Sequence, residues 1–513
     1  MLFYNSPVEP GAKVVRPRKS FVAATFALPG RLAGMLVAAI MLVTSCTDPE
    51  VNPDNTLRAN AGPDQQVQVG QPVNLDGSTS QDSQSKPFTF QWTITQKPAK
   101  STVTLTGATT AKPTFVPDEV GDYEVELTVT NADGKSTDKV VIAASVSQPI
   151  TLDKNITVKT VLEDRIVNPN LPDYIVPKDI AVEHELTIQP GVVIAFERDV
   201  RMNINDKGSI VAKGTPEKRI RFVGVGNTKG YWVGIMLYSG SNVNVMEYVD
   251  VLHAGSRTLM SGQKAGMAMF GNAQVALENS LFTENDGYGL YAPETASLRT
   301  FVKNTFTKNK EAGIAVDLAN VEKLDAESVF TGENGRNVVE VSGYYLKKKE
   351  KDQVSWGGFK DKTPYRLMGS ISVQVGWKLN PGVTIEVARD VAIMIEDEAY
   401  MTAKGTATDK IKFTSATAAA AYWKGILSYS TSTQNIIENA EISNAGSVTI
   451  LSGKKANVAL YGAGSILTIK NTKISGSGGY GIFEAYGTAI NKDAATANTF
   501  EGNAQGSVLS ENK

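Results

Sequence analysis

The stretch Leu186-Thr187-Ile188-Gln189-Pro190-Gly191-Val192 opens a segment, residues 186–265, that the chain contains twice. Short motifs recur 191 residues later: Pro190-Gly191-Val192 as Pro381-Gly382-Val383, Lys213-Gly214-Thr215 as Lys404-Gly405-Thr406, Tyr231-Trp232 as Tyr422-Trp423, Ala254-Gly255-Ser256 as Ala445-Gly446-Ser447, and Ser261-Gly262 as Ser452-Gly453. Farther on, the offset widens to 192 and then 194 residues: Tyr288-Gly289 as Tyr480-Gly481, and Asn304-Thr305-Phe306 as Asn498-Thr499-Phe500. This pattern indicates an internal duplication with small insertions in surface loops.

Between these motifs, short apolar runs alternate with Gly, Asn, Asp and Lys throughout residues 150–513. Examples are Leu186-Thr187-Ile188, Val193-Ile194-Ala195-Phe196 and Ile220-Arg221-Phe222. No segment has the long amphipathic pattern of a crossover helix. Strands this short bury a continuous core only when they stack as rungs, each contacting its neighbours. The sequence therefore predicts an all-β solenoid in two homologous units, residues 150–341 and 342–513.

The end of each copy resembles a known coil signature. Asn304-Thr305-Phe306-Thr307-Lys308-Asn309 and Asn498-Thr499-Phe500-Glu501-Gly502-Asn503 are similar to coils of right-handed parallel β-helices. The resemblance implies that Phe306 and Phe500 point into the column while Asn turns the chain. The repeated motifs also resemble a class of β-helix proteins on bacterial surfaces, which implies a fold and not an activity. The charged run Lys347–Asp352 lies at the boundary between the copies, where we interpret it as a solvated loop.

Residues 58–147 have a different pattern, typical of a β-sandwich. Phe88-Thr89-Phe90-Gln91-Trp92-Thr93-Ile94 alternates apolar and polar residues, and Asn131-Ala132-Asp133-Gly134 supplies a hairpin turn. Strands at this spacing favour an immunoglobulin-like fold. The landmarks that carry a closer resemblance, to PKD (polycystic-kidney-disease-type) domains, are Ala61-Gly62-Pro63-Asp64, Leu75-Asp76-Gly77-Ser78, Trp92, Gly121-Asp122-Tyr123 and Leu127-Thr128-Val129-Thr130. We expect Trp92 to be a core residue rather than a carbohydrate platform.

The N-terminal region is typical of an exported protein. A basic flank precedes the apolar run Met35–Val43, which is too short to span a membrane but suits a signal peptide. Val43-Thr44-Ser45-Cys46 resembles a bacterial lipobox, which implies a signal peptide over residues 1–46 and a lipid on Cys46. The following Thr47-Asp48-Pro49-Glu50 is similar to surface-export signals of some Bacteroidetes lipoproteins. The resemblance implies an outer-membrane, lipid-anchored, surface-exposed protein with a flexible linker at residues 47–57.

Bulk composition narrows the function classes. The chain has 513 residues, a formal net charge of −2 and a single cysteine. One cysteine cannot form an intrachain disulfide. A mildly acidic chain lacks the basic surface that nucleic-acid binding requires, so we expect no nucleic-acid partner.

Catalytic chemistry has one weak candidate. His253 lies near Asp250 and Glu247 and becomes Asn444 in the second copy, so it is a candidate general base. The alternative is that His253 occupies an Asn-like turn position. A site grafted onto one copy should appear as a polar cluster that the other copy lacks. We expect no metal ligand set and no cofactor, because paired His or Cys spacing is absent, although calcium at sandwich-loop aspartates is an open alternative.

Four repeated aromatic residues are the candidate ligand-binding residues: Tyr231, Trp232, Tyr422 and Trp423. Flat rings stack on sugar faces, and two copies would give a bivalent surface with an avidity gain. The alternative is that one ring of each pair packs in the core.

Together these patterns predict a lipid-anchored, non-catalytic binding or adhesion protein at the cell surface. Its β-helix would present polar faces to a polysaccharide or a protein, and its anchor would contact the membrane. One alternative is a polysaccharide lyase or glycoside hydrolase of the β-helix class. Another is a purely structural surface protein.

Overall fold

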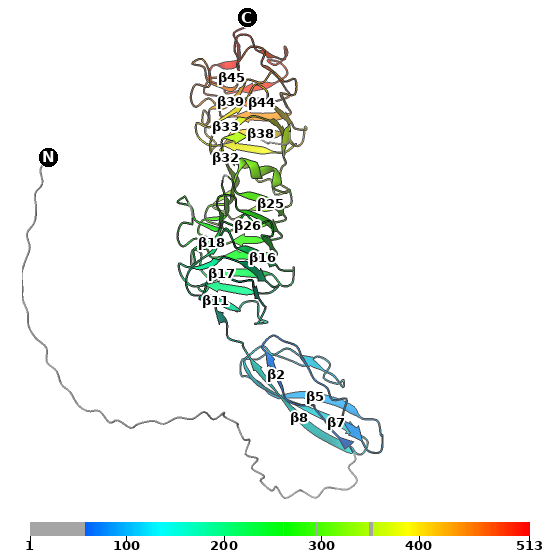
Figure 1. Cartoon of the computed structure of the whole chain (residues 1–513). Coiled ribbons are helices and arrows are strands. Elements are labelled where there is room, and N and C mark those ends of the chain that lie inside the picture. Colours follow the sequence, from blue (N-terminus) through cyan, green and yellow to red (C-terminus); the bar gives the residue numbers. More distant parts are fainter. Residues whose placement is uncertain (1–56, 260, 294, 348–351, 513) are drawn as a thin grey trace, which may run out of the picture. The chain divides into compact units, whose positions relative to one another are not determined.

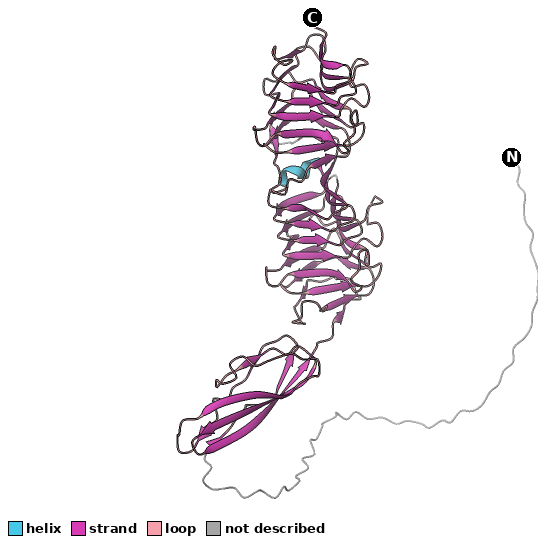
Figure 2. Cartoon of the chain, turned by 180° about the vertical axis from the view of Figure 1, so that it is seen from behind, coloured by secondary structure: helices cyan, strands magenta, loops and turns pink. Residues whose placement is uncertain are grey.

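The computed structural model describes residues 57–259, 261–293, 295–347 and 352–512 (Figure 1). The predicted signal peptide, Cys46 and linker residues 47–56 lie outside the described residues, as does most of the charged run. Among the described residues, the regular structure is β-strand except for one short 3-10 helix, η1 (Leu318–Lys323), which is cyan in Figure 2.

The first part of the described chain is a β-sandwich. Its eight strands are β1 (Leu57–Arg58), β2 (Gln65–Gln68), β3 (Val73–Asn74), β4 (Gln81–Asp82), β5 (Thr89–Gln96), β6 (Thr114–Phe115), β7 (Gly121–Asn131) and β8 (Gly134–Ser145). A four-stranded sheet in the order β2-β8-β7-β5 faces two strand pairs, β1-β4 and β3-β6. Period-two alternation on β7 buries Tyr123 and every second residue as far as Val129 in the core that contains Trp92.

The rest of the chain forms parallel sheets, which confirms the predicted parallel β-helix. Successive strands of the first unit are assigned in turn to three sheets. Sheet 1 contains β9 (Ile150–Thr151), β11 (Tyr174–Val176), β14 (Val193–Phe196), β17 (Ile220–Gly224), β20 (Val249–Leu252), β23 (Leu281–Thr283), β26 (Thr305–Thr307) and β28 (Val329–Gly332). Sheet 2 begins with β12 (Ile180–Val182), β15 (Arg201–Ile204), β18 (Gly234–Leu237), β21 (Ala265–Met269), β24 (Tyr288–Ala292), β27 (Ala312–Asp317) and β29 (Arg336–Ser342). Sheet 3 contains β10 (Thr160–Leu162), β13 (Glu185–Ile188), β16 (Ser209–Lys213), β19 (Val245–Glu247), β22 (Gln274–Glu278) and β25 (Ser297–Val302).

The second unit also has three sheets, one of which it shares with the first. Sheet 2 continues through β32 (Tyr365–Leu367), β35 (Thr384–Val387), β38 (Ile411–Ser415), β41 (Ala440–Ser443), β44 (Lys473–Ser475) and β47 (Thr499–Glu501). Sheet 4 contains β30 (Tyr345–Leu346), β33 (Ile371–Val373), β36 (Ala392–Ile395), β39 (Gly425–Ser428), β42 (Ala456–Leu460), β45 (Tyr480–Glu484) and β48 (Gly506–Ser510). Sheet 5 contains β31 (Gln353–Trp356), β34 (Gly376–Leu379), β37 (Tyr400–Lys404), β40 (Ile436–Glu438), β43 (Ile466–Lys470) and β46 (Ala489–Ile490).

Inward side chains stack in register along the column. On sheet 1, Phe222 pairs with Val251, Val251 with Phe282, and Phe282 with Phe306. The rings of Phe282 and Phe306 stack with centroids 5.2 Å apart, and those of Phe306 and Phe330 with centroids 5.4 Å apart. Phe306 is fully buried, whereas Phe500, in the last coil, is half-buried against the same core. The expected inward orientation of both phenylalanines is therefore confirmed.

Asparagine side chains form a second ladder at the turns. The Nδ2 of Asn285 donates to Oδ1 of Asn309 at 2.9 Å, and the Nδ2 of Asn309 donates to Oδ1 of Asn334 at 3.0 Å. Each also donates to a strand carbonyl, as Asn309 does to Phe282 at 2.9 Å. Buried polar groups are tolerated only when their hydrogen bonds are satisfied, so this ladder explains the repeated Asn at turns.

The two units form one column, because sheet 2 runs through both. At the junction, β29 pairs with β32, Val339 opposite Tyr365 and Val341 opposite Leu367. One hydrophobic core extends from Ile156 to Ala494. In the turn that contains β26 and β27, η1 takes the place of a sheet 3 strand, and its buried Leu318 and Val321 join that core.

The second unit is turned by one face relative to the first. Strand β11 of sheet 1 is equivalent in sequence to β32, which lies in sheet 2. Likewise β12 of sheet 2 is equivalent to β33 of sheet 4, and β13 of sheet 3 to β34 of sheet 5. The repeat therefore covers a whole number of turns plus one of the three faces.

Candidate functional site

The two predicted tryptophans lie inside the column. Trp232 is fully buried, stacks on Phe196 with ring centroids 4.2 Å apart, and donates from Nε1 to the Leu252 carbonyl at 2.7 Å. Trp423 is also fully buried and donates to the Ser443 carbonyl at 2.7 Å. A ring stacks on a sugar only if one face is exposed, so these tryptophans follow the core-packing alternative that the sequence left open.

The two predicted tyrosines are half-buried beneath arginines. The Arg198 guanidinium lies 4.6 Å from the centroid of the Tyr231 ring, and Arg389 lies 4.6 Å from that of Tyr422. The Tyr231 ring also packs on glycine backbone, since a Cβ at Gly226 would lie 2.4 Å from a ring atom. The arginine covers part of each ring, and the rest of the tyrosine remains partly exposed.

His253 has the same backbone conformation as Asn444, the equivalent residue of the second unit. Both His253 and Asn444 have positive φ, 65° and 66°, a region in which Asn is favoured. Only 5% of His253 is exposed, its Nε2 lies 3.5 Å from Glu284 Oε2, and its buried Nδ1 lacks a hydrogen-bond partner in the structure. Burial, more than any charge, lowers the pKa of His253, so its neutral form is favoured.

His253 borders an apolar hollow on the outer face of sheet 1. The hollow has a volume of about 480 Å³, and its apolar lining includes Val193, Ala195 and Val223. In the second unit these positions are Thr384, Glu386 and Thr414, so the apolar surface belongs to the first unit alone.

A charged hollow occurs at equivalent places in both units. In the first unit Arg219, Arg221 and Asp250 line a hollow of about 500 Å³, and Lys410, Lys412 and Glu441 line one of about 490 Å³ in the second. Asp250 accepts hydrogen bonds from Arg219, and the Arg219 Nη2 to Asp250 Oδ1 distance is 2.6 Å. Burial raises the pKa of Asp250, opposed by Arg219.

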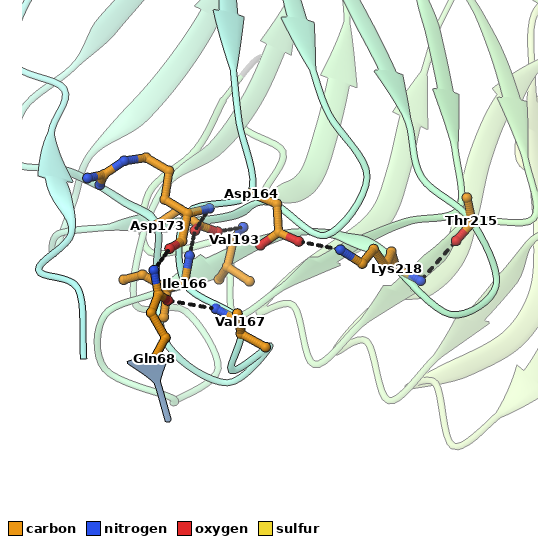
Figure 3. A network of polar contacts seen from close by, with 9 residues as sticks. Gln68, Asp164, Ile166, Val167, Asp173, Val193, Thr215 and Lys218 are labelled. Atoms are coloured by element: carbon orange, nitrogen blue, oxygen red, sulfur yellow. Dashed lines mark hydrogen bonds and ion pairs between the residues drawn. The ribbon is translucent and has the colours of Figure 1, made fainter. Parts of the chain in front are cut away.

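Neighbouring carboxylates beside the first charged hollow have structural partners (Figure 3). Asp173 accepts from the backbone N–H of Ile166 at 2.7 Å and of Val193 at 2.8 Å. Asp164 pairs with Lys218 Nζ at 2.9 Å. These bonds fix the first coils.

Partly exposed aromatic residues follow strands at equivalent places in both units. We call these pairs the aromatic edges: Tyr238 with Phe270 in the first unit, and Tyr429 with Tyr461 in the second. Their rings meet edge to face, with centroids 5.7 Å apart in the first pair and 5.9 Å apart in the second. Phe270 is 51% exposed and Tyr461 is 46% exposed, so each edge offers ring surface to solvent.

Backbone pairing holds each aromatic edge in place. Tyr238 follows β18 and donates from its N–H to Ile204 at 2.8 Å, and Phe270 follows β21 and donates to Leu237 at 2.9 Å. The second unit repeats these bonds from Tyr429 to Ile395 at 2.8 Å and from Tyr461 to Ser428 at 3.0 Å. The aromatic rings therefore sit on adjacent rungs, which lie about 4.8 Å apart.

A polar groove adjoins the aromatic edge of the first unit. Its volume is about 570 Å³, and it is lined by Glu183, Arg201, Asn203, Asn205, Asp206, Lys207 and Tyr238. The second unit has different side chains at the equivalent positions: Gln374, Ala392, Met394, Glu396, Asp397, Glu398 and Tyr429. The groove thus contains a mixed charge cluster of the kind expected for a site grafted onto one copy. Sequence reasoning missed it because its residues come from successive coils.

No group of three or more His, Cys, Asp and Glu side chains in the described part of the chain is placed to hold a metal ion. No helix within these residues is long and apolar enough to cross a membrane.

The β-sandwich matches a known domain family. Residues 61–143 match a family model that is described as a PKD domain. The sandwich is a PKD domain. A solved PKD domain from the KIAA 1837 protein is 30% identical, and the match covers 17% of this chain and 84% of that domain, with a TM-score of 0.15.

Two larger solved proteins show weaker similarity. A nucleoside hydrolase-related protein from Saccharophagus degradans is 18% identical, over 18% of this chain and 25% of that one, with a TM-score of 0.16. A SusE-like, surface-located polysaccharide-binding protein from Bacteroides thetaiotaomicron is 11% identical, over 25% of this chain and 19% of that one, with a TM-score of 0.13. No curated protein matches the chain.

Several polar side chains of the PKD domain form hydrogen bonds within the domain. Trp92 is buried and donates from Nε1 to the Thr110 carbonyl at 3.1 Å, so it is a core residue. The carboxylate of Asp64 accepts from the Val141 N–H at 2.8 Å, and that of Asp118 from the Thr102 N–H at 2.7 Å. These aspartates stabilise loops through backbone donors.

Proposed function

We propose that this protein is a non-catalytic, cell-surface carbohydrate-binding protein whose β-helix presents aromatic edges to polysaccharide. The observation that carries the proposal is the recurrence of exposed aromatic pairs at one place in both units. A buried ring recurs because the core needs it, whereas half-exposed Phe270 and Tyr461 contribute less to packing.

The chemistry of these edges suits a sugar polymer. A pyranose presents an apolar C–H face that packs on an aromatic ring, while its hydroxyls require hydrogen-bond partners. The groove beside Tyr238 supplies such partners in the amides of Asn203 and Asn205 and in the charged groups around them. Polar groups placed beside an apolar contact fix the orientation of a bound ligand.

The N-terminal sequence supports the cellular setting that we propose. A lipid on Cys46 would anchor the chain to the outer membrane, and the PKD domain would act as a spacer before the β-helix. The β-helix would then reach polysaccharide, or a surface protein, outside the cell.

A binding assay with matched variants tests the proposal. Full-length protein is run through gels containing soluble polysaccharides, and the retarding polymer is then titrated to obtain Kd. Replacing Phe270 and Tyr461 together by Ala should weaken binding about tenfold or more, or about 1.4 kcal/mol. Because the two side chains are partly exposed, the free energy of unfolding should change by only about 0.5 kcal/mol per substitution.

Tyr344→Ala is the matched control. Tyr344 is 49% exposed and also packs edge to face, on Tyr345, but it precedes its strand whereas the edge residues follow theirs. Equal affinity of the double variant and wild type for every retarding polysaccharide would reject the aromatic edges as the binding surface.

An enzyme is the second candidate function, and the mixed groove of the first unit favours it. Glu183 and Asp206 share this groove with Arg201 and Lys207, and three of the four change in the second unit. A hydrolase needs two carboxylates on one face. Release of reducing ends that disappears in Glu183→Gln, with binding retained, would establish this alternative.

A further inference from the structure

We propose that the two aromatic edges hold two different polysaccharide chains, so that one protein molecule cross-links them. The inference rests on the proposed function and concerns how its two sites are arranged. The observation behind it is that equivalent strands of the two units lie on different faces of the column.

The faces are identified by the strands that the aromatic residues follow. Tyr238 and Phe270 follow β18 and β21, which belong to sheet 2. Tyr429 and Tyr461 follow β39 and β42, which belong to sheet 4. In the second unit, sheet 2 instead carries β38 and β41, which are equivalent to sheet 1 strands of the first unit. The two edges are therefore one face of the column apart.

The turn between the edges is fixed by hydrogen-bonded structure. Glu340 of β29 lies opposite Arg366 of β32 in the shared sheet, with a paired residue on each side. The hydrophobic core is continuous past this point. A rotation that brought both edges onto one face would have to break this sheet and open the core.

The edges are also separated along the column. The second edge follows β39, and β39 comes directly after β38 of sheet 2 in the chain. Between β21 and β38, sheet 2 contains the strands β24, β27, β29, β32 and β35. Six steps at about 4.8 Å place the edges roughly 29 Å apart along the column. An extended sugar chain on the first edge would have to pass around a corner of the column to reach the second.

This geometry distinguishes two binding modes: one polysaccharide chain bound at both edges, or a separate chain bound at each edge. Two linked sites gain affinity for one ligand only when that ligand engages both at once, and the gain disappears when geometry forbids it. The edges should therefore act as independent sites for one stiff chain, and a second chain can occupy the other edge.

The experiment uses the full chain with three neutral polysaccharides: xyloglucan, galactomannan and mixed-linkage β-glucan. Neutral polymers avoid any bias from the different charges beside the two edges. Light scattering follows polymer size as protein is added, and Kd is measured for fragments of increasing length. The variants are Phe270→Ala, Tyr461→Ala and the control Tyr344→Ala, with the size of the protein alone recorded for each.

Wild type and the control should raise polymer size, with a maximum near equal numbers of sites and chains. Each single-edge variant should still bind but raise polymer size at least fivefold less. The Kd for fragments long enough to span both edges should stay within about twofold of the Kd for short ones.

A tenfold or greater gain in affinity with fragment length would mean that one chain winds past both edges, and would overturn the inference. Binding at both edges without growth in polymer size would overturn it as well, while leaving the proposed function intact. Failure of wild type to bind any of the polysaccharides in the gel panel would reject the proposed function and this inference together.

Discussion

His253 and Asn444 occupy the same backbone position in the two units, with φ of 65° and 66°. The ring of His253 is buried without a partner for Nδ1, whereas the Nδ2 of Asn444 donates to Ser415 Oγ at 2.9 Å. The residue equivalent to Ser415 in the first unit is Gly224, which has no side chain to offer. His253 is thus the less well-satisfied member of the pair.

The first prediction is that acid weakens the first unit through His253. Burial holds the pKa of folded His253 below 6.5, so as pH falls through 6.5 the unfolded state binds protons before the folded state does. The stabilisation by neutral His253 is therefore complete above about pH 6.5 and is lost as pH falls toward the folded-state pKa.

Unfolding by urea at several pH values measures this effect. His253→Asn should remove it, because Asn suits the positive φ and does not titrate in this range. His184, which is exposed, supplies the control as His184→Asn. An unchanged pH slope in His253→Asn would show that protonation of His253 is not linked to unfolding.

The second prediction concerns the stacked rings of the core. Truncating Phe306 to Ala removes contacts with Phe282 and Phe330 and should cost about 3–5 kcal/mol. Because rungs interact mainly with their neighbours, amide exchange should rise around residues 280–330 and change little around 420–480. Hydrogen exchange with mass spectrometry measures both regions.

Phe500→Ala is the comparison variant, and its damage should remain at the C-terminal coils, where few rungs lie beyond it. Uniform loss of protection across both units in either variant would mean that the column unfolds as one cooperative body.

The third prediction concerns Cys46. In a bacterial host, Cys46→Ser should leave the protein unprocessed or soluble, because the lipobox thiol is the proposed site of lipid attachment. Labelling with a radioactive fatty acid reports this directly. Label that persists in the variant would contradict the proposed anchor.

The fourth prediction is that purified protein releases neither reducing ends nor unsaturated sugars from pectin, alginate, or plant and algal polysaccharides. Asp164 and Asp250, which line the first charged hollow, are paired with Lys218 and Arg219, so the carboxylates that remain to be tested are Glu183 and Asp206 of the polar groove. Turnover that is lost in His253→Ala or Glu183→Gln would contradict a non-catalytic protein and assign the site.

Most of the fold could be predicted from local patterns in the sequence. Period-two alternation in residues 88–94 predicted the strand that contains Trp92, and the constant offset of 191 residues predicted the two homologous units. The recurring Asn-Thr-Phe triplet identified an inward ring, because a coil has one interior for every copy. These features depend on neighbours in sequence or on the adjacent rung.

The face shift could not be predicted, because it depends on how many strands each turn contributes. Replacement of a sheet 3 strand by η1 is not visible as a break in the apolar pattern, since Leu318 and Val321 still face the core. An offset in residues fixes which positions are equivalent but not the direction in which they face.

The sequence predicted the kind of candidate site, a set of repeated aromatic residues, but not the residues of the aromatic edges. For Tyr231-Trp232 the sequence left open whether the rings bind a ligand or one of them packs in the core, and the tryptophan is the ring that is buried. A usable signal for the aromatic edges did exist: Tyr238 and Tyr429 share the offset, as do Phe270 and Tyr461. Their exposure depended on the loops around them, which the sequence pattern did not resolve.

The shift by one of the three faces in each repeat relates the two units by an approximate threefold screw operation. A third copy joined in the same way would be rotated by one more face, and a fourth would face the same way as the first. Tandem duplication would therefore wind equivalent surfaces around the column with a period of three copies. Adding or deleting one strand at the junction would change the pitch of that screw and thereby redirect every later copy at once.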